Sequence, residues 1–591
     1  MNKSIFNRYK CIFVIFILLF GILLEQLVRL QILDGKKLTV MADKMRMQIV
    51  VGTEYPRGDI LDYKKRSLLD SQKKKTLIVF PAVVKKNDSL IRELSSILHI
   101  SYGNIVNQIG LMQKNYGNRP FVLKSNLNIE EELKINNLKA KGIYIVPIEG
   151  RYGSHSLAVH LIGHVGQIDN NSWQKLKKHY ASEDELNSYK KNTIIGVKGL
   201  EAIYDRYLRE TEPDHYIAAA VDAKGNVLDG LGFRKIANVT TNKQKNNLVL
   251  TLDKDIQRIV EDVLDHQVKK GAVVILRIST GEVVAMASRP SFKQDAVFQY
   301  IQNDKVSAEF TNRSLEHYYP GSVFKIVIAA ASLEEGLVKP NDFFNCVEKF
   351  VFANGETIPC WKKGGHGKIS FSEAFAQSCN STFIQLALRL GSDKIQDYAN
   401  RFGLTEDYLI GYKNEQFQSI NIPKNNDVAI GNASLGQQGI MLTPLQIAGI
   451  ISTIANNGVM HKPRVANSIE NNDHKIIKQW FTPKGQRVIS KKTALLMQSL
   501  LKDTALTGTG KKAWISGWGS AGKTGSAQTG NYAANGKEIL NTWFAGYAPL
   551  EKPEYAVTVL VENGTAGGVD AAPIFKKIME QILALKYASP K

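Results

Sequence analysis

The chain has 591 residues, of which 44% are hydrophobic and 22% are charged, which is the composition of a folded protein with more than one domain. Its formal net charge is +21, which suits anionic partners such as nucleic acid, an anionic membrane or an anionic polymer. The sequence has no zinc finger, no phosphate-binding loop and no aromatic-glycine RNA motif, so nucleic acid is not favoured as a partner.

The N-terminus has the pattern of a membrane anchor. Its first ten residues, MNKSIFNRYK, include three basic residues and no acidic one, and an apolar run follows from Cys11 to Leu24. The segment EQLVRLQIL completes a span of about 20 residues. No small-residue cleavage site follows, so we predict an uncleaved transmembrane helix at 11–33 and a cytoplasmic stub at 1–10. The rest of the chain then lies outside the plasma membrane.

The region at 34–240 alternates strand-like runs, such as TLIVFPAVV, with polar helical stretches, such as NIEEELKIN. It contains no cluster of residues typical of nucleophilic catalysis, and the lysine-rich segment 240–247 is typical of a linker. His155, His160 and His164 could suggest a metal site. We do not expect one there, because no acidic residue separates His160 from His164 as in a zinc protease helix.

A sharper pattern starts at Leu248. LVLTLD is an alternating strand, DIQRIVEDVLDHQV is an amphipathic helix, and GAVVILRISTGEVVAMAS is a β-hairpin. Helical segments follow from about 317 to 510, and the strands AGKTGSAQTG, NTWFAGYAP and YAVTVLVENG precede a last helix. Strands at both ends with helices between them predict one sheet built from the two ends of a domain.

The four cysteines allow one disulfide outside the cell. Cys11 lies in the predicted anchor, and Cys346 and Cys360 flank a short loop and could pair. Cys379 would then remain a free thiol. No Cys/His spacing resembles a structural zinc site, so the sequence predicts no metal.

The segment YYPGSVFKIVIAA, at 318–330, begins a helix that is apolar on every face. Lys325 stands in its first turn, three residues after Ser322. In one interpretation the lysine stem packs at the edge of a core helix and its ammonium group reaches water. In the other, Ser322 is a nucleophile and Lys325 is its base, with a pKa lowered by burial and with helix N-terminal N–H groups available to an oxyanion.

Two further short motifs follow in the chain. Ser378 and Asn380, in FAQSCNSTF, interrupt a helical pattern, so the serine can shuttle a proton and the asparagine amide can hold a substrate carbonyl. Lys523-Thr524-Gly525 lies on a C-terminal strand, where the lysine and hydroxyl can bind a carboxylate and the glycine lets another backbone approach. Each motif alone also fits a structural role, as a helix cap or as a strand-end turn.

The ordered set of three motifs is typical of penicillin-binding proteins and serine β-lactamases. Over nearly its whole length, the chain resembles a class B penicillin-binding protein. One departure is serine at position 526, where many members have threonine. Further stretches carry the resemblance: RGDILD, GVKGLEAIYDRYL, NASLGQQGIMLTPLQIAGIISTIANNG, GTG, KTGSAQ, WFAGYAP and GGVDAAPIF.

The resemblance implies an α/β (α+β) fold in three parts. These are the transmembrane helix at 11–33, an elongated mixed pedestal, or dimerisation, domain at 34–240, and a transpeptidase domain at 248–588. The last is expected to contain a five-stranded antiparallel sheet with a helical subdomain.

The resemblance also implies a role for each motif. Ser322 would attack the carbonyl between two D-alanines of a stem peptide, and Lys325 would take its proton. Ser378 would relay that proton to the leaving D-alanine, with Lys523 nearby, and Asn380 would hold the substrate amide.

The remaining positions of the third motif would bind the substrate carboxylate, with Lys523, Thr524 and Ser526 as its ligands and Gly525 allowing a close approach. The backbone N–H groups of Ser322 and Ser526 would form the oxyanion hole. β-Lactams would trap Ser322 as a slowly hydrolysed ester.

The expected partners are peptidoglycan stem peptides, β-lactam antibiotics, the plasma membrane and a glycosyltransferase in a wall-synthesis complex, with no nucleic acid, metal or cofactor. Three alternatives stay open: a D,D-carboxypeptidase, a β-lactamase, and a non-catalytic β-lactam sensor or scaffold. The long pedestal argues against a β-lactamase. The short stub before the anchor leaves no room for the cytoplasmic output of a sensor.

Overall fold

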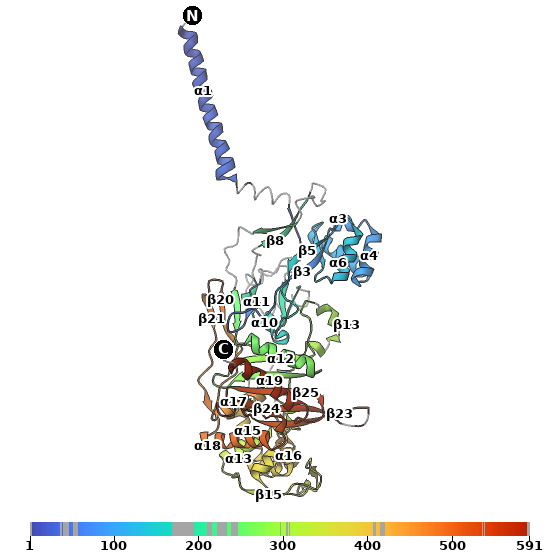
Figure 1. Cartoon of the computed structure of the whole chain (residues 1–591), viewed down its shortest axis with the longest axis vertical. Coiled ribbons are helices and arrows are strands. Elements are labelled where there is room, and N and C mark those ends of the chain that lie inside the picture. The colour runs from blue at the N-terminus through green and yellow to red at the C-terminus, as the bar shows by residue number, and fades with distance from the viewer. Residues whose placement is uncertain are drawn as a thin grey trace. The chain divides into compact units, whose positions relative to one another are not determined.

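The computed structural model describes residues 3–35, 38, 47–50, 57–167, 194–209, 215–221, 233–237, 246–295, 297–302, 305–306, 308–405, 409–413, 420–534, 536 and 538–587. The chain forms two compact units (Figure 1). Unit 1 is Met1–Pro56, Ser71–Arg151 and Thr211–Lys243, and unit 2 is Arg57–Asp70, Tyr152–Glu210 and Gln244–Lys591. Of the predicted linker, 240–245 lie outside the described residues.

The N-terminal helix α1 (Lys3–Val28) continues into a short π-helical turn, η1 (Arg29–Leu33). The window Ile12–Leu33 has 22 residues and is long and apolar enough to cross a membrane. Its side chains are exposed on every face, as the 70% exposure of Phe16 illustrates. A helix that is apolar all round needs an apolar surrounding, so the window agrees with the anchor predicted at 11–33.

The rest of unit 1 has two three-stranded antiparallel sheets, in the strand orders β4-β3-β5 and β1-β8-β9. Leu77 and Val79 of β3 pack with Leu94 of α4 in the core beside the first sheet. The elements of unit 1 after the anchor are β1 (Met47–Ile49), β3 (Lys73–Val79), α3 (Pro81–Val84), α4 (Asp88–Leu98), α5 (Tyr102–Tyr116), β4 (Phe121–Lys124), α6 (Ile129–Leu138), β5 (Ile143–Glu149), β8 (His215–Ala220) and β9 (Phe233–Ala237).

The N-terminal part of unit 2 is held by a buried charge network. Arg57 donates to Glu201 Oε2 through Nε at 3.1 Å and Nη2 at 2.8 Å, and its Nη1 donates to Asp205 Oδ1 at 2.5 Å. The Arg57 side chain is 1% exposed. The surrounding elements are β2 (Ile60–Leu61), α7 (Val159–Ile162), β6 (His164–Gln167), β7 (Ile194–Lys198), α10 (Gly199–Ile203) and α11 (Asp205–Leu208).

A five-stranded antiparallel sheet, in the order β12-β11-β25-β24-β23, forms the centre of unit 2. Its first two strands form the predicted hairpin, and the other three come from the C-terminal part of the chain. The prediction of one sheet built from both ends of a domain is therefore confirmed. The strands are β11 (Gly271–Arg277), β12 (Val283–Arg289), β23 (Ala521–Tyr532), β24 (Glu538–Ala548) and β25 (Tyr555–Gly564).

Both faces of this sheet are covered by helices. Val273 and Ile275 of β11 join a core with α12 (Lys254–Gln267) and α19 (Ala571–Tyr587), whereas Val274 and Leu276 join a core with α13 and α17. Figure 1 shows α12 and α19 on one side of β24 and β25 and the helical subdomain on the other. A strand buried on both faces explains the uninterrupted apolar run GAVVILR.

The helical subdomain has α13 (Lys325–Glu334), α14 (Phe371–Ala376), α15 (Asn380–Arg401), α16 (Asp427–Ser434), α17 (Pro444–Ala455) and α18 (Lys491–Leu506). Ser370 and Glu373 form a capping box that starts α14. The shorter elements of unit 2 are β10 (Asn246–Leu250), η2 (Val297–Tyr300), β13 (Ile301–Gln302), β14 (Lys305–Val306), η3 (Ala308–Phe310), η4 (Gly321–Val323), β15 (Phe343–Cys346), β16 (Lys349–Val351), β17 (Thr357–Pro359), β18 (Gly367–Ser370), β19 (Val459–Met460), β20 (Ala466–Asn471), β21 (Ile476–Gln479), β22 (Gln486–Arg487) and η5 (Lys511–Ala513).

Candidate active site

Ser322 lies in the short 3₁₀ turn η4, directly before α13. The sequence predicts that the helix begins at Ser322, whereas the α-helix begins at Lys325. The turn is fixed by Gly321, which has a φ of 57° and donates its N–H to the Gly436 carbonyl at 2.9 Å. Lys325 follows Ser322 by three residues, a spacing that places two side chains on neighbouring positions of a helical surface.

Lys325 is completely buried and makes three hydrogen bonds. Its Nζ donates to the Ser378 carbonyl oxygen at 2.9 Å, to Ser378 Oγ at 3.2 Å and to Asn380 Oδ1 at 2.7 Å. The Phe383 ring lies beneath it, with Nζ 5.3 Å from the ring centroid. The lysine therefore does not reach water, and the interpretation with its ammonium group in solvent is wrong.

The turn between α14 and α15 carries the second motif, as predicted. Ser378 adopts a left-handed conformation with a φ of 57°, and Asn380 is the first residue of α15. The Asn380 side-chain amide also donates through Nδ2 to the Pro359 carbonyl at 3.0 Å. Asn380 is thus held between Lys325 and the strand β17, which fixes the direction of its amide.

The third motif lies on β23, whose backbone passes directly beside η4. A Cβ atom added to Gly525 would lie 2.8 Å from the Pro320 carbonyl oxygen, and one added to Gly321 would lie 2.8 Å from the Ser526 carbonyl oxygen. Both separations are too short for a real side chain. The two glycines therefore let the backbone at Ser526 approach the turn η4, which carries Ser322. An oxyanion site built from the N–H groups of Ser322 and Ser526 would require this approach.

Two hydroxyls of β23 are fixed by partners from other elements. Thr524 Oγ1 lies 2.6 Å from Thr509 Oγ1, and Ser526 Oγ accepts from the Gly567 N–H at 3.2 Å. Thr509 was not predicted as a neighbour of the site, although it lies in the GTG stretch at 508–510. The distance along the chain between that stretch and β23 gives no sign of the contact.

Burial sets the charge of the two lysines. Desolvation lowers the pKa of Lys325 to about 8, against a smaller upward effect of Cys379 and Cys360. Desolvation and then the neighbouring Lys325 hold the pKa of Lys523 well below its ordinary value. Two buried lysines beside each other disfavour double protonation, so the charge of each lysine favours the neutral amine of the other.

We expect acylation by a β-lactam to become faster as the pH rises to about 8. The base must be the neutral amine, and below its pKa the neutral fraction of Lys325 falls tenfold per pH unit. The second-order acylation rate, measured with a fluorescent penicillin between pH 6 and pH 10, should rise with a slope near one and level off above about 8. A flat profile between pH 6 and pH 8 would contradict a Lys325 base.

Cys346 and Cys360, for which pairing was left open, form no disulfide. Cys346, Cys360 and Cys379 are all free and buried. Their sulfur atoms and one ring nitrogen of His366 lie within 4.8 Å of one another, so four side chains from three separate segments meet beside the turn that carries Ser378 and Asn380. We call these four residues the thiol–histidine cluster.

The spacing within the thiol–histidine cluster fits tetrahedral zinc. Zinc–sulfur bonds of about 2.3 Å and zinc–nitrogen bonds of about 2.0–2.1 Å place a bound sulfur and nitrogen about 3.6 Å apart. His366 Nδ1 lies 3.6 Å from Cys346 Sγ and 3.5 Å from Cys360 Sγ. The positions of these residues along the chain match no known zinc-binding spacing. For that reason the sequence predicted no metal.

His160 and His164, considered above as metal ligands, pack edge-on against Phe292. His160 Nε2 lies 2.7 Å from the Glu309 carbonyl oxygen. Desolvation lowers the pKa of both histidines to about 4, so both are neutral at pH 7. Their surroundings are those of core histidines, whereas His155 is exposed.

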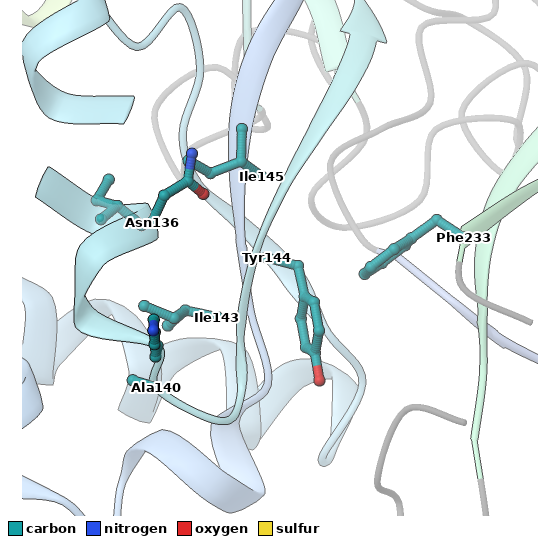
Figure 2. A pocket seen from close by; sticks show the side chains of 8 residues that line it. Asn136, Ala140, Ile143, Tyr144, Ile145 and Phe233 are labelled. Carbon is teal, nitrogen blue, oxygen red and sulfur yellow. The ribbon is translucent and has the colours of Figure 1, made fainter. Parts of the chain in front are cut away.

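Unit 1 contains a separate hollow of about 350 Å³ (Figure 2). Its wall includes Ile143 and Tyr144 of β5 and Phe233 of β9, and the Tyr144 and Phe233 rings lie 5.4 Å apart. The side chains around it are mainly apolar and include no serine, cysteine or carboxylate. The residues of the three motifs all lie in unit 2, so this hollow is not part of their site.

The chain matches two known protein families. Residues 271–580 match the family described as "Penicillin binding protein transpeptidase domain", and residues 53–285 match "Penicillin-binding Protein dimerisation domain". The chain is 29% identical to Stage V sporulation protein D of Bacillus subtilis, over 96% of this chain and 85% of that protein. It is 25% identical to peptidoglycan D,D-transpeptidase MrdA of Haemophilus influenzae, over 98% of this chain and 92% of that protein.

Two solved structures are also similar. The crystal structure of PBPA from Mycobacterium tuberculosis aligns with a TM-score of 0.52 and 28% identity, covering 57% of this chain and 81% of that one. Penicillin-Binding Protein (PBP2) from Helicobacter pylori aligns with a TM-score of 0.68 and 22% identity, covering 92% of this chain and 99% of that one. At 22% identity, the similarity to the second structure shows a shared fold.

Proposed function

Since the chain belongs to the penicillin-binding protein transpeptidase family, with a dimerisation domain as in class B, we propose that it cross-links peptidoglycan through an acyl-enzyme on Ser322. The chain is a membrane-anchored D,D-transpeptidase of the serine type, and its substrates are stem peptides. The observation that best supports the role of Ser322 is the fully buried Lys325 one turn away, with its pKa lowered to about 8.

In the proposed reaction, the neutral amine of Lys325 accepts the Ser322 hydroxyl proton as Oγ attacks the carbonyl between two D-alanines. Ser378 Oγ, 3.2 Å from Lys325 Nζ, then passes a proton to the departing D-alanine nitrogen. An amine from a neighbouring stem peptide attacks the ester, and the same groups take its proton. The backbone N–H groups of Ser322 and Ser526 stabilise the oxyanion in both steps.

The other site residues bind and orient the substrate in this proposal. Lys523, Thr524 and Ser526 line the strand that receives the terminal carboxylate, and the Thr509 contact holds the Thr524 hydroxyl in place. Gly525 keeps the strand close to the nucleophile turn. The Asn380 amide holds the substrate amide, with its orientation set by Lys325 and Pro359.

We further propose that residues 1–10 stay in the cytoplasm and that the parts of both units that follow the anchor lie outside the plasma membrane. Basic residues before an apolar span and the extracellular location of peptidoglycan support this orientation. Transpeptidation needs freshly made glycan strands, so we propose a separate glycosyltransferase as a partner. The domain limits of 34–240 and 248–588 remain part of the same proposal.

The experiment is acylation of the full-length chain, in detergent, by a fluorescent penicillin, followed by intact mass over time beside Ser322→Ala. We expect one stable adduct on the wild-type chain and none on the variant, because Ser322 is the proposed nucleophile, whereas Ser378, which also contacts Lys325, is the proposed proton relay. An adduct on Ser322→Ala would place the nucleophile elsewhere. An adduct that disappears within seconds would show a β-lactamase.

A D,D-carboxypeptidase uses water where a transpeptidase uses an amine. A stem-peptide ester, supplied with and without a D-amino acid acceptor, separates the two activities. We expect most of the acyl group to reach the amine. Hydrolysis that is unaffected by the acceptor would identify a carboxypeptidase.

A further inference from the structure

We propose that Glu562 is a positioning residue for the nucleophile. Through the hydroxyl group of Tyr318, it ties the strand β25 to the segment 318–321, which leads into Ser322. Neither Glu562 nor Tyr318 belongs to one of the three motifs. The inference rests on the proposed function, because acylation of Ser322 is its readout.

Tyr318 is held on two sides, four positions before Ser322. Its hydroxyl donates to Glu562 Oε1 at 2.9 Å, across 244 positions of the chain. Its main chain pairs with Leu442 in both directions: the Tyr318 N–H donates to the Leu442 carbonyl at 3.0 Å, and the Leu442 N–H donates to the Tyr318 carbonyl at 2.8 Å. The side chain of Tyr318 therefore joins the central sheet, while its backbone joins the loop before α17.

Glu562 is itself fixed by a buried cation. Arg313 Nε donates to the same Oε1 atom at 2.7 Å, and the Arg313 and Glu562 side chains are 5% and 18% exposed. Arg313 Nη1 also donates to the Ala308 carbonyl at 3.1 Å, and its backbone N–H donates to Ser288 Oγ of β12 at 3.1 Å. Charge-assisted hydrogen bonds of this kind are short and strong. Glu562 is thus a firm point of attachment for the Tyr318 hydroxyl.

The next residue of the segment is held by the neighbouring strand. Trp543 of β24 is fully buried, and its Nε1 donates to the Tyr319 carbonyl at 3.2 Å. Its ring meets the Tyr318 ring edge-on, with the centroids 6.0 Å apart. Trp543 also lies opposite Gly525 in the pairing of β24 with β23. The strands β25, β24 and β23 therefore hold the segment at Tyr318, at Tyr319 and at the turn η4.

The position of this segment matters because the partners of Ser322 are fixed separately. Lys325 Nζ is held by its three hydrogen bonds to the second motif, and the Ser526 backbone belongs to β23. A shift of the segment changes the distance from Ser322 to both partners at once. A misplacement of about 1 Å at a reacting group costs on the order of 100-fold in rate, so we expect about tenfold for the smaller shift that follows the loss of one attachment.

The Tyr318 hydroxyl keeps its proton over the pH range of the acylation assay. Burial, and then the neighbouring Glu562 carboxylate, raise the pKa of Tyr318. The hydroxyl therefore donates to Glu562 throughout this range. Removing it should lower the acylation rate by the same factor at every pH and leave the inflection near pH 8 in place, because that inflection belongs to Lys325.

The test compares Tyr318→Phe with Tyr398→Phe in the full-length chain in detergent. Tyr398 is also buried in unit 2, and its hydroxyl donates to Glu335 Oε1 at 2.8 Å, where Glu335 also binds Lys394 at 2.9 Å. Glu335 lies at the far end of α13 from the nucleophile turn. Both variants lose one tyrosine–glutamate bond, so both should unfold at a similarly lowered temperature. Only Tyr318→Phe should slow acylation, by about tenfold.

The acylation rate is measured with fluorescent penicillin over a range of concentrations, which separates the rate constant for acylation from the dissociation constant of the non-covalent complex. Because Tyr318 acts on the position of Ser322, we expect only the rate constant to fall. Glu562→Gln keeps an oxygen that accepts from Tyr318 and should acylate at a rate closer to wild type than Tyr318→Phe does. Adding Tyr318→Phe to Glu562→Ala should cause no further loss, because both changes remove the same bond.

Three results would each overturn the inference: an unchanged rate constant in Tyr318→Phe, an equal slowing in Tyr398→Phe, or a change confined to the dissociation constant. An altered inflection in the pH profile of Tyr318→Phe would also contradict it, since it would assign the hydroxyl to the proton transfer. A wild-type chain that penicillin does not acylate would overturn the proposed function and the inference together. An acylated wild-type chain beside an equally fast Tyr318→Phe would overturn the inference alone.

Discussion

Replacing Lys325 by methionine should lower the rate of acylation by penicillin about 1000-fold and leave the chain folded. General base catalysis contributes about 10²–10⁴-fold, and methionine matches the lysine stem while it removes the amine. A buried charge replaced by an apolar side chain of similar size usually costs little stability. Methionine cannot donate the hydrogen bonds that Lys325 makes to Asn380 Oδ1 and Ser378 Oγ, and we expect this loss to cause any decrease in stability. The measurement is the second-order acylation rate beside the thermal unfolding curve.

Two further variants make this result specific. Lys325→Arg keeps a cation in the pocket but holds its proton at every accessible pH, so it should be as inactive as Lys325→Met. Lys339→Met removes an exposed lysine just beyond α13 and should acylate at the wild-type rate. Activity of Lys325→Arg within tenfold of wild type would show that Lys325 supplies charge and not a base.

Arg57→Met should destabilise unit 2 by about 3–5 kcal/mol, the usual cost of leaving a buried charge without its partner. Arg57 binds both Glu201 and Asp205, and the Glu201 side chain is 0% exposed. Without the guanidinium, Glu201 loses its cation in the interior, whereas Asp205 keeps Arg209, whose Nε lies 3.4 Å from Asp205 Oδ2. Urea unfolding followed by tryptophan fluorescence should show a lower midpoint for the variant.

The exposed pair of Lys134 and Glu130 provides the contrast, since these side chains are 55% and 75% exposed. Lys134→Met should change stability by less than about 1 kcal/mol. Adding Glu201→Gln and Asp205→Asn to Arg57→Met should recover part of the loss, because the amides carry no charge. An equal midpoint for Arg57→Met and the wild-type chain would show that the network contributes nothing.

Local patterns predicted much of the fold. The anchor, the hairpin of β11 and β12 and the strand with Lys523 each depend on residues near one another in the chain, so apolar periodicity and turn residues reveal them. The predicted start of α13, at Ser322, lies three residues before its start in the structure, at Lys325. Gly321 and its packing against β23 impose a 3₁₀ turn there, and such long-range packing leaves no local pattern.

The site was predicted in part for the same reason. Ser322, Lys325, Ser378 and Asn380 stood out because short motifs preserve their spacing, and the structure brings Lys325 into contact with the second motif. The thiol–histidine cluster was missed, since its four residues come from β15, a loop after β17 and the turn before α15. These segments come together only in the folded chain, through long-range contacts that leave no regular spacing in the sequence.

The pairing of β11 with β25 constrains how the protein can be made. Gly271 lies opposite Val561, about 290 positions later, so the two central strands have a very high sequence separation. During synthesis, α13 and the turn η4 emerge long before β23, β24 and β25 are available to cover them. Until those strands arrive, the apolar surface of α13 must be shielded by other means, and the turn with Ser322 lacks the backbone of Ser526 beside it. The incomplete chain is therefore exposed to misfolding and proteolysis during this interval.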